Sequence, residues 1–263
     1  RILAEGAKKY KAEGVSAVIM DPHTGAIKGM ANYPSYDPDQ YAKVSEPALF
    51  QNAAVSHPIE IGSIMKTLVT AATLDQGLIT PTTTYYDPAF WEIDGYKVKN
   101  IEEDGGPGIK SIAELLNLSL NTGATWELMR MGGGEINAKA RSTWFDYMTN
   151  HFRFSKKSGI EQGYEAAGYV PGPKDTGAGI NLTYANTSFG QAMTATTLQA
   201  SAALAATLNG GTFYKPHLVA QTQNAKGEMV AVRPTVLQHN VVSPKVSADM
   251  VPLLQYVVDH HNI

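Results

Sequence analysis

Cysteine is absent from this 263-residue chain. The fold therefore uses neither disulfide bonds nor thiolate metal ligands, and the absence suits an oxidising compartment. A strong charge of either sign is also missing, because 21 Lys and Arg residues stand against 24 Asp and Glu residues and the net charge is -3. No basic stripe follows any expected helix, so nucleic-acid binding has no support, and small or peptidic partners fit better.

Long apolar runs are lacking as well. No stretch reaches the length that spans a bilayer, and the opening residues do not begin a signal peptide. Because the sequence does not start with Met, we expect it to be an excised part of a longer polypeptide. The seven histidines follow no metal-binding spacing, so we expect neither a metal site nor a cofactor. The chain is long enough to bury a substantial core.

Local patterns predict helices interspersed with short strands. A helix over residues 3–12 precedes two strands, over 14–20 and 26–31, that a turn joins into a hairpin. Further helices are expected over residues 63–76, from residue 111, and over residues 124–130, 135–148, 194–208 and 243–258. The remaining segments are expected to be short strands and turns over 79–108, a loop over 159–174, and a β-ribbon formed by 212–219 and 228–233.

Ser63 and Lys66 stand three residues apart where a helix is expected to start. One helical turn places them on the same face, and a nearby amine is one of the few ways to make a serine hydroxyl attack a carbonyl. We therefore hypothesise acyl transfer through Ser63. An N-capping serine followed by a surface lysine is the plainer interpretation of this spacing alone. Gly62, which permits close backbone approach, and the pair Ser119 and Asn121 on a helix-breaking turn favour the catalytic one.

The two motifs, Ser63 with Lys66 and Ser119 with Asn121, together resemble the first two active-site motifs of the penicillin-binding protein transpeptidases. The resemblance is to the class B, monofunctional members and covers nearly the whole chain. Further matching segments are residues 18–27, 33–38, 159–161, 165–168, 190–191 and 194–199. It implies an α/β (α+β) fold similar to that of serine β-lactamases, with an antiparallel sheet flanked by helices and an all-α subdomain that carries the Ser-x-x-Lys helix. Residues 1–263 would form one partial transpeptidase domain.

The resemblance also implies a role for each motif residue. Lys66, neutral in the resting site, would take the proton of Ser63 as its oxygen attacks the penultimate D-alanine carbonyl of a peptidoglycan stem peptide. Ser119 would pass a proton to the leaving D-alanine nitrogen, and Asn121 would bind the substrate's amide backbone and hold Lys66. The Ser63 N–H would supply half of the oxyanion hole. An amine from a neighbouring stem peptide would then resolve the acyl-enzyme and form a cross-link.

The same chemistry implies covalent inhibition by β-lactams. We expect slow deacylation, because the sequence has no glutamate motif of the kind that class A β-lactamases use to activate water. The family acts outside the cytoplasmic membrane, so the resemblance implies a periplasmic or outer-face location and an anchor upstream of Arg1. A glycosyltransferase and division or elongation proteins would be its partners.

The third family motif, Lys-[Thr/Ser]-Gly on a strand, should follow the last helix, but the sequence ends at Ile263 first. We expect residues beyond Ile263 or another polypeptide to supply it, together with strands that pair with the hairpin at residues 15–31. Residues 157–159 match the motif's letters, yet the resemblance assigns them to a loop. Ile61 departs from the proline that the family usually has there.

Two alternative functions are considered beside transpeptidation. A serine β-lactamase or a D,D-carboxypeptidase of the same fold would use the same nucleophile. A non-catalytic β-lactam sensor or cell-wall scaffold would keep the fold without turnover. Penicillin hydrolysis and penicillin labelling separate these alternatives.

Overall fold

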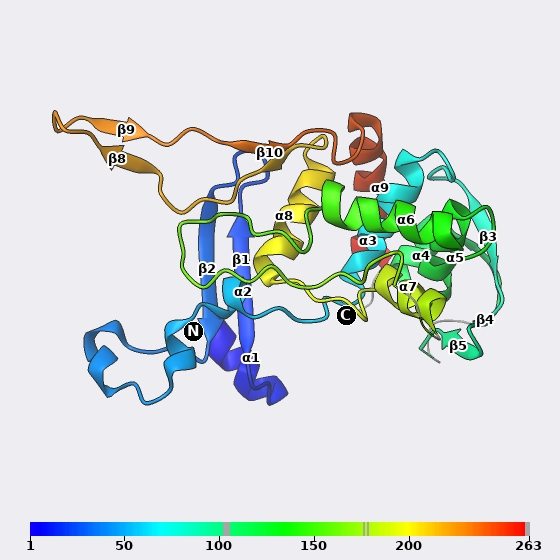
Figure 1. Cartoon of the computed structure of the whole chain (residues 1–263), viewed down its shortest axis with the longest axis horizontal. Helices are drawn as coiled ribbons and strands as arrows, with labels where there is room; N and C mark the ends of the chain where they lie inside the picture. Colours follow the sequence, from blue (N-terminus) through cyan, green and yellow to red (C-terminus); the bar gives the residue numbers. More distant parts are fainter. Residues whose placement is uncertain (102–105, 176, 178, 261–263) are drawn as a thin grey trace.

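The computed structural model describes residues 1–101, 106–175, 177 and 179–260, and Figure 1 shows the β1–β2 hairpin standing beside a group of packed helices. The described α-helices are α1 (Ile2–Tyr10), α2 (Ala53–Ser56), α3 (Ile64–Asp75), α4 (Ile112–Asn117), α5 (Asn121–Met131), α6 (Ala138–Asp146), α7 (Ile180–Ser188), α8 (Thr197–Leu208) and α9 (Pro244–His260). Shorter helical segments are the 3-10 helices η1 (Pro38–Lys43) and η2 (Pro47–Phe50) and the π-helical turn η3 (Tyr147–His151).

The described strands form antiparallel pairs. These pairs are β1 (Val15–Met20) with β2 (Ile27–Tyr33), β3 (Thr84–Asp87) with β6 (Gly108–Ser111), β4 (Phe90–Ile93) with β5 (Tyr96–Lys99), β7 (Phe213–Tyr214) with β10 (Val236–Gln238), and β8 (Gln221–Gln223) with β9 (Met229–Ala231). The mixture of helices and antiparallel strands confirms the predicted α+β class.

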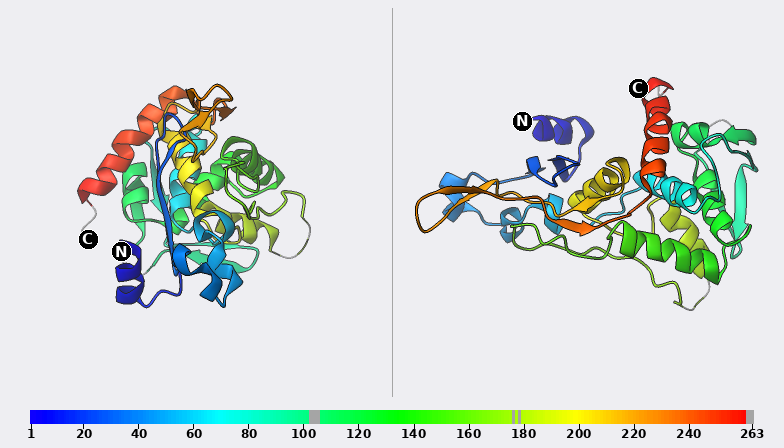
Figure 2. Two further views of the ribbon diagram at one scale, coloured as in Figure 1. Left: turned by 90° about the vertical axis from the view of Figure 1, so that its left-hand side faces the viewer. Right: turned by 90° about the horizontal axis from the view of Figure 1, so that it is seen from above.

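The β1–β2 hairpin is the predicted opening hairpin. Its register starts at the pair Val15 and Tyr33. Figure 2 shows α1 against one face of the hairpin and α8 against the opposite face, where Ser16 Oγ lies 2.7 Å from Thr197 Oγ1. Among the residues that the structure describes, no third strand pairs with β1 or β2. A two-stranded hairpin is marginal in water, so the packing of α1 and α8 stabilises it.

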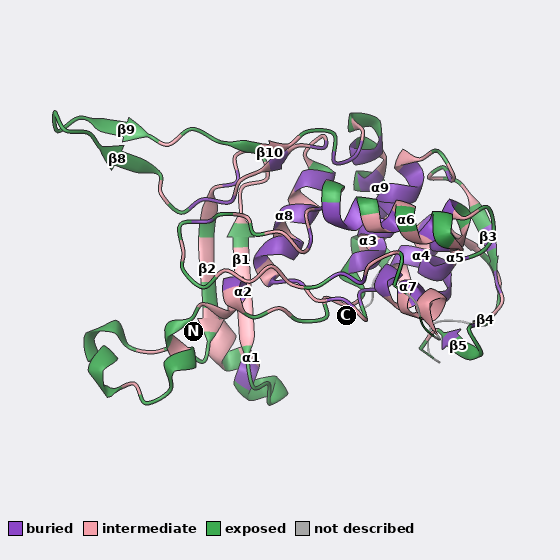
Figure 3. Cartoon of the chain, in the orientation of Figure 1, coloured by how far each residue is buried: buried purple, intermediate pink, exposed green. Residues whose placement is uncertain are grey.

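Helix α3 is the centre of the hydrophobic core. Every residue from Leu68 to Leu74 is buried, and α4, α5, α7, α8 and α9 all contact this helix. Figure 3 shows the buried residues concentrated in α3 and its neighbours. A helix that is surrounded by close packing cannot shift without losing contacts with its neighbours. The residues at its amino terminus are therefore held on a rigid element.

Asp75, the last residue of α3, links this helix to α9. Its Oδ1 accepts a hydrogen bond from Ser243 N over 2.7 Å, and its Oδ2 accepts one from Tyr147 Oη over 2.8 Å. Ser243 Oγ in turn accepts the Val246 N–H over 3.3 Å, so the predicted Ser-Pro start of the last helix is confirmed.

Within the described part of the chain, no helix has both the length and the apolar character needed to cross a bilayer.

The excursion between α3 and α4 has the short strands that the sequence predicts. Hairpin β4–β5 lies within the longer connection from β3 to β6. The capping signature that starts α4 is also confirmed, because Ser111 Oγ accepts the Glu114 N–H over 3.2 Å and Glu114 Oε2 accepts the Ser111 N–H over 2.7 Å.

Three expectations about the second half are wrong. The helix expected over residues 135–148 starts only at Ala138, after the Asn137 cap, and the π-helical turn η3 replaces its last turn. The β-ribbon between residues 212–219 and 228–233 does not form, because β7 pairs with β10 and β8 pairs with β9. Strands of two or three residues carry too few side chains to specify a partner. Helix α8 starts at Thr197 rather than at residue 194, because Thr196 caps it together with Gln199.

Helix α7 is missing from the sequence prediction. Its residues have no clear apolar stripe, and its N-cap, Gly179, offers no side chain to the first turn. The acceptor comes instead from Asp94, at the tip of hairpin β4–β5, whose Oδ2 accepts the N–H groups of Asn181 over 2.8 Å and Leu182 over 3.0 Å. A cap from another element leaves no local signal.

Candidate active site

Ser63 lies at the amino terminus of α3. It is the N-cap residue and is exposed, whereas Lys66, one turn along the helix, is 2% exposed. Lys66 Nζ donates a hydrogen bond to Ser63 Oγ over 2.9 Å. The predicted pair is therefore in direct contact, with a hydroxyl open to solvent and a buried amine.

The same amine also contacts the second motif. Lys66 Nζ donates to Ser119 Oγ over 2.8 Å and to the Ser119 carbonyl oxygen. The structure thus brings Ser63, Lys66 and Ser119 together, with the amine between two hydroxyl groups. An amine in this position can take a proton from one hydroxyl while the other relays a proton onward.

Ser119 occupies a left-handed turn after α4, with a φ of 54°. Its N–H donates to Leu116 O over 3.2 Å, and the Leu120 N–H donates to Leu115 O over 3.0 Å. These two bonds define a Schellman motif, in which glycine is the usual residue at the Ser119 position. A residue with a side chain costs roughly 1–2 kcal/mol in this conformation. The candidate proton relay is therefore held in a strained backbone.

Asn121 is the first residue of α5. Its Nδ2 donates to the Lys99 carbonyl oxygen over 3.0 Å, at the end of β5. This bond orients the Asn121 amide next to the turn that carries Ser119. The roles expected of Asn121, binding the substrate backbone and holding Lys66, stay predictions.

The backbone before Ser63 is supported by a later segment. The Gly62 N–H donates to Gly190 O over 3.1 Å, and both glycines have positive φ values, 64° and 79°. Three residues earlier, Ile59 and Ala195 form an antiparallel bridge. Segment 190–195, part of which carries the resemblance, is therefore the immediate support of the serine motif.

A buried polar network next to the second motif was not predicted. Asp87 Oδ2 accepts from Thr122 Oγ1 over 2.7 Å and from Asn100 Nδ2 over 3.0 Å, and Asn100 Oδ1 accepts the Thr122 N–H over 3.0 Å. Asp87 and Thr122 are fully buried. The sequence signal is slight, because these polar residues lie far apart in the chain at the ends of short strands and of a helix.

Glu127, two turns into α5, adds a buried carboxyl group beside α3. Burial raises its pKa well above the ordinary value of 4.5, while a hydrogen bond from Thr70 Oγ1, over 3.0 Å, partly opposes that rise. Its other oxygen, Oε1, is buried without a hydrogen-bond partner. The fold therefore favours the protonated form of Glu127.

Residues Lys157 to Gly159, which match the letters of the third motif, lie in an irregular segment after η3. The Ser158 N–H and the Gly159 N–H bind the Glu165 carboxylate, over 2.6 Å and 2.9 Å. They do not form the strand that the third motif requires. Their place in a loop agrees with the assignment that the resemblance implies.

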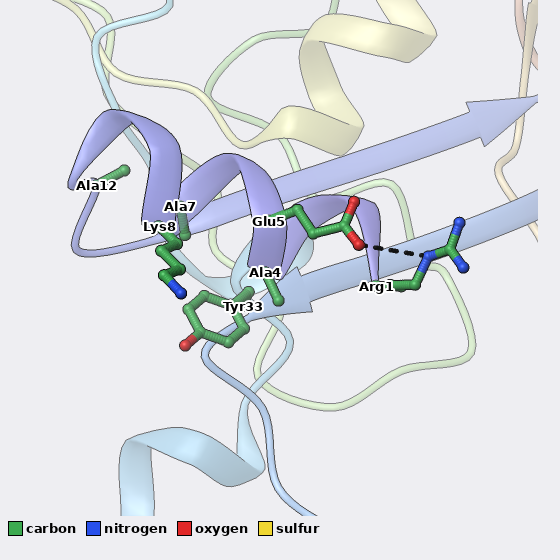
Figure 4. A pocket seen from close by; sticks show the side chains of 7 residues that line it. All are labelled: Arg1, Ala4, Glu5, Ala7, Lys8, Ala12 and Tyr33. Atoms are coloured by element: carbon green, nitrogen blue, oxygen red, sulfur yellow. Dashed lines mark ion pairs between the residues drawn. The ribbon is translucent and has the colours of Figure 1, made fainter.

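The candidate active site is separate from an open hollow of about 530 Å³ beside α1. Figure 4 shows the residues that line the hollow: Arg1, Ala4, Glu5, Ala7, Lys8, Ala12 and Tyr33. None of the serine, lysine and asparagine residues of the two motifs is among them. Across the described residues, no group of three or more His, Asp or Glu side chains is placed to hold a metal ion.

Comparison with known proteins identifies similar chains. The family model for the penicillin binding protein transpeptidase domain matches residues 15–262. Stage V sporulation protein D of Bacillus subtilis is 28% identical over 260 residues, which are 98% of this chain and 38% of that protein. The probable peptidoglycan D,D-transpeptidase FtsI of Caulobacter vibrioides is 27% identical over 209 residues, 80% of this chain and 33% of that protein.

The fold has equally clear relatives among solved structures. Penicillin binding protein 3 of Mycobacterium tuberculosis, complexed with ampicillin, superimposes with a TM-score of 0.84 at 26% identity and covers 97% of this chain. This chain covers 54% of that structure and only 38% and 33% of the two curated relatives. The match therefore concerns one part of longer proteins.

Proposed function

Because the chain belongs to the penicillin-binding protein transpeptidase family, we propose that it is the acyl-transfer domain of a peptidoglycan D,D-transpeptidase. The observation that carries the proposal is the position of Lys66 Nζ, 2.9 Å from Ser63 Oγ and 2.8 Å from Ser119 Oγ. Relatives named peptidoglycan D,D-transpeptidases, matched over 80% of this chain, support the reaction class.

In the proposed acylation Lys66 is neutral, so the hydrogen bond across the 2.9 Å contact is reversed and the Ser63 hydroxyl donates to the lone pair of Nζ. Lys66 then takes the proton of Ser63 as Ser63 Oγ attacks the penultimate D-alanine carbonyl carbon of a stem peptide. A bond forms between Oγ and that carbon. The bond to the terminal D-alanine nitrogen then breaks, and Ser119 Oγ passes the proton from Lys66 to the leaving amine. Lys66 is buried, which suits a base, and Ser63 is exposed, which suits a nucleophile that a substrate must reach.

Two further groups bind the substrate in this scheme. The Ser63 N–H, at the amino terminus of α3, donates to the developing oxyanion, and Asn121 binds the amide backbone of the stem peptide. In the second half-reaction an amine of a neighbouring stem peptide attacks the acyl carbon. Its C–N bond forms as the bond to Ser63 Oγ breaks, and the proton that the amine loses passes through Lys66 to Ser63 Oγ. This transfer regenerates the hydroxyl and leaves a cross-link.

A β-lactam would be attacked by Ser63 in the same way. Its leaving group stays tethered to the acyl product, so the covalent adduct would persist and inhibit the enzyme. The ampicillin and aztreonam complexes of the Mycobacterium tuberculosis relative support this part of the proposal. The proposed location is extracytoplasmic, where peptidoglycan is cross-linked, and the proposed partners are a glycosyltransferase and division or elongation proteins.

The test is labelling of the full-length polypeptide with a fluorescent penicillin. We expect one stable adduct on Ser63, identified by peptide mass mapping, and none in Ser63→Ala. Ser201→Ala serves as the matched control, because the Ser201 hydroxyl donates to Thr197 O within α8, outside the two motifs. Labelling that persists in Ser63→Ala would contradict the assigned nucleophile.

The same preparation separates the alternative functions. Rapid hydrolysis of the penicillin would indicate a β-lactamase, and release of D-alanine to water without cross-linking to an added amine would indicate a D,D-carboxypeptidase. Labelling without any turnover of a stem peptide would indicate a β-lactam sensor. A folded polypeptide that is not labelled would indicate a scaffold.

A further inference from the structure

The turn that carries Ser119 is unfavourable on its own. Ser119 has a φ of 54°, in the region where glycine is usual. Helix α5 begins two residues later, and its N-cap, Leu120, has no side chain that can accept a hydrogen bond. The N–H groups in the first turn of a helix need acceptors. The local sequence therefore favours neither the left-handed conformation of Ser119 nor the start of α5 at Asn121.

The missing acceptor comes from the end of β5. Asn100 Oδ1 accepts the Thr122 N–H over 3.0 Å, which is the bond that a capping side chain would make. The neighbouring residue, Asn121, donates its side-chain amide to Lys99 O over 3.0 Å. Asn121 and Thr122, the first two residues of α5, are thus bound to Lys99, the last residue of β5, and to Asn100, the residue that follows it. These bonds fix the start of α5 relative to the hairpin.

Asp87 in turn fixes Asn100. Its Oδ2 accepts from Asn100 Nδ2 over 3.0 Å and from Thr122 Oγ1 over 2.7 Å, and its Oδ1 accepts the Ala89 N–H over 2.9 Å. Asp87 and Thr122 are fully buried. A buried carboxylate is costly unless its hydrogen bonds are made, so this network has one favourable arrangement.

We propose that Asp87, Asn100 and Thr122 are positioning residues for Ser119. They hold the first turn of α5, and α5 holds the strained turn in which the Ser119 hydroxyl lies 2.8 Å from Lys66 Nζ. Their hydrogen bonds described above join them to one another and to Ala89, so we assign them an indirect role rather than a catalytic one. The inference deepens the proposed function and rests on it for the role of the Ser119 hydroxyl, while the effect on the turn itself is independent of that function.

The experiment compares Thr122→Val, which removes the hydroxyl at constant shape, with Thr122→Ser, which keeps it. The first readout is amide hydrogen exchange at Ser119 and Leu120, whose N–H groups close the turn. The second is acylation of the full-length polypeptide by a fluorescent penicillin, resolved into the acylation rate constant and the dissociation constant of the noncovalent complex. Thr73→Val is the matched control, because Thr73 is equally buried and its hydroxyl donates to Val69 O within α3.

In Thr122→Val we expect faster exchange at both amides and an acylation rate constant lower by roughly ten- to a hundredfold, with the dissociation constant nearly unchanged. Thr122→Ser should restore both readouts, and Thr73→Val should change neither despite its loss of stability. Asn100→Ala, which keeps the bond between Asp87 and Thr122, is the second variant if Thr122→Val does not fold. It should show the same pattern as Thr122→Val.

The outcomes distinguish this inference from the proposed function. If the wild type is not acylated, the proposed function fails, and hydrogen exchange alone still decides whether the network holds the turn. Unchanged exchange at Ser119 in both Thr122→Val and Asn100→Ala would overturn the inference. An equal loss of acylation in Thr73→Val would also overturn it, because the effect would then follow stability rather than position.

Discussion

Gly190 lies so close to Gly62 that a β-carbon on Gly190 would stand 2.1 Å from the Gly62 carbonyl oxygen. Gly62 immediately precedes the candidate nucleophile, Ser63. The contact therefore joins a segment beyond α7 to the first turn of α3, and it requires glycine for two reasons. One is the clash, and the other is the φ of 79° at Gly190.

Gly190→Ala should destabilise the fold and displace Ser63. We expect a loss of about 2–5 kcal/mol in the free energy of unfolding, from the left-handed backbone and the overpacking together. Gly77→Ala is the control, because Gly77 has a φ of 66° but no atom within 4 Å of the added carbon. It should lose only about 1–2 kcal/mol. Urea denaturation measures the free energy of unfolding of both variants. Equal losses would contradict the expected clash, because they would show that the backbone at Gly62 moves away from the added carbon at no cost.

Replacement of Ser119 should separate stability from chemistry. Ser119→Gly relieves the left-handed backbone and Ser119→Ala does not, so the glycine variant should be the more stable by about 1–2 kcal/mol. Both variants lack the hydroxyl, so both should be acylated by penicillin about a hundredfold or more slowly. Thermal unfolding and labelling kinetics provide the two measurements. A glycine variant no more stable than the alanine variant would mean that the turn stores no strain.

Buried Glu127 should make stability fall as pH rises. Its pKa in the fold is raised above 4.5. Below that pH the carboxyl group is protonated in both the folded and the unfolded state, so it does not change the free energy of unfolding. Above it the unfolded chain ionises first, and the free energy of unfolding should fall by up to about 1.4 kcal/mol per pH unit until the pKa of the folded state is reached. Glu127→Gln, which mimics the protonated acid, should flatten this dependence in urea denaturation at a series of pH values upward from 4.5.

Glu114 provides the control of opposite sign. Hydrogen bonds from Ser111 N and Ser111 Oγ lower the pKa of its carboxyl group, so the stability that it contributes is present above the ordinary pKa of 4.5 and is lost as pH falls through the lowered value. Glu114→Gln should therefore flatten the acid side of the stability profile and leave the neutral side alone. A Glu127→Gln profile that keeps the wild-type fall in stability just above pH 4.5 would disprove the role of Glu127.

Asp94→Ala should weaken α7 without affecting the candidate active site. Asp94 accepts the N–H groups of Asn181 and Leu182, and loss of such a cap costs about 0.5–2 kcal/mol. Asp94→Asn keeps an acceptor oxygen and tolerates the φ of 52°, so its loss should be smaller. Denaturation of the two variants tests the order, with penicillin labelling run in parallel. A labelling rate that falls with stability would link α7 to the serine motif.

The features that the sequence predicts well are those with local causes. The start of α3 beside Ser63 and the capping pair of Ser111 and Glu114 each depend on residues within one helical turn. The proximity of Ser63 and Lys66 follows from the same geometry. Their contact with Ser119 was an implication of the family resemblance. Sequence spacing alone cannot predict that two motifs separated by more than one helix lie next to each other in the fold.

The features that the sequence did not predict have causes elsewhere in the chain. Helix α7 is capped by Asp94 across 87 residues, and α5 is capped by Asn100 across 22 residues. The pairing of β7 with β10 depends on the packing of very short strands rather than on their side-chain pattern. In each case the residue that satisfies a backbone group belongs to another element, so no local window contains both partners.

Helix α3 also determines when the candidate active site can form during synthesis. The backbone before Ser63 is supported by residues 190–195, and the far end of the helix, at Asp75, is bound to Ser243 across 168 residues. A ribosome that has made both motifs has still not made these supports. Ser63 is thus translated well before residues 190–195 and Ser243, so the ends of its helix can be held only after these long-range contacts form.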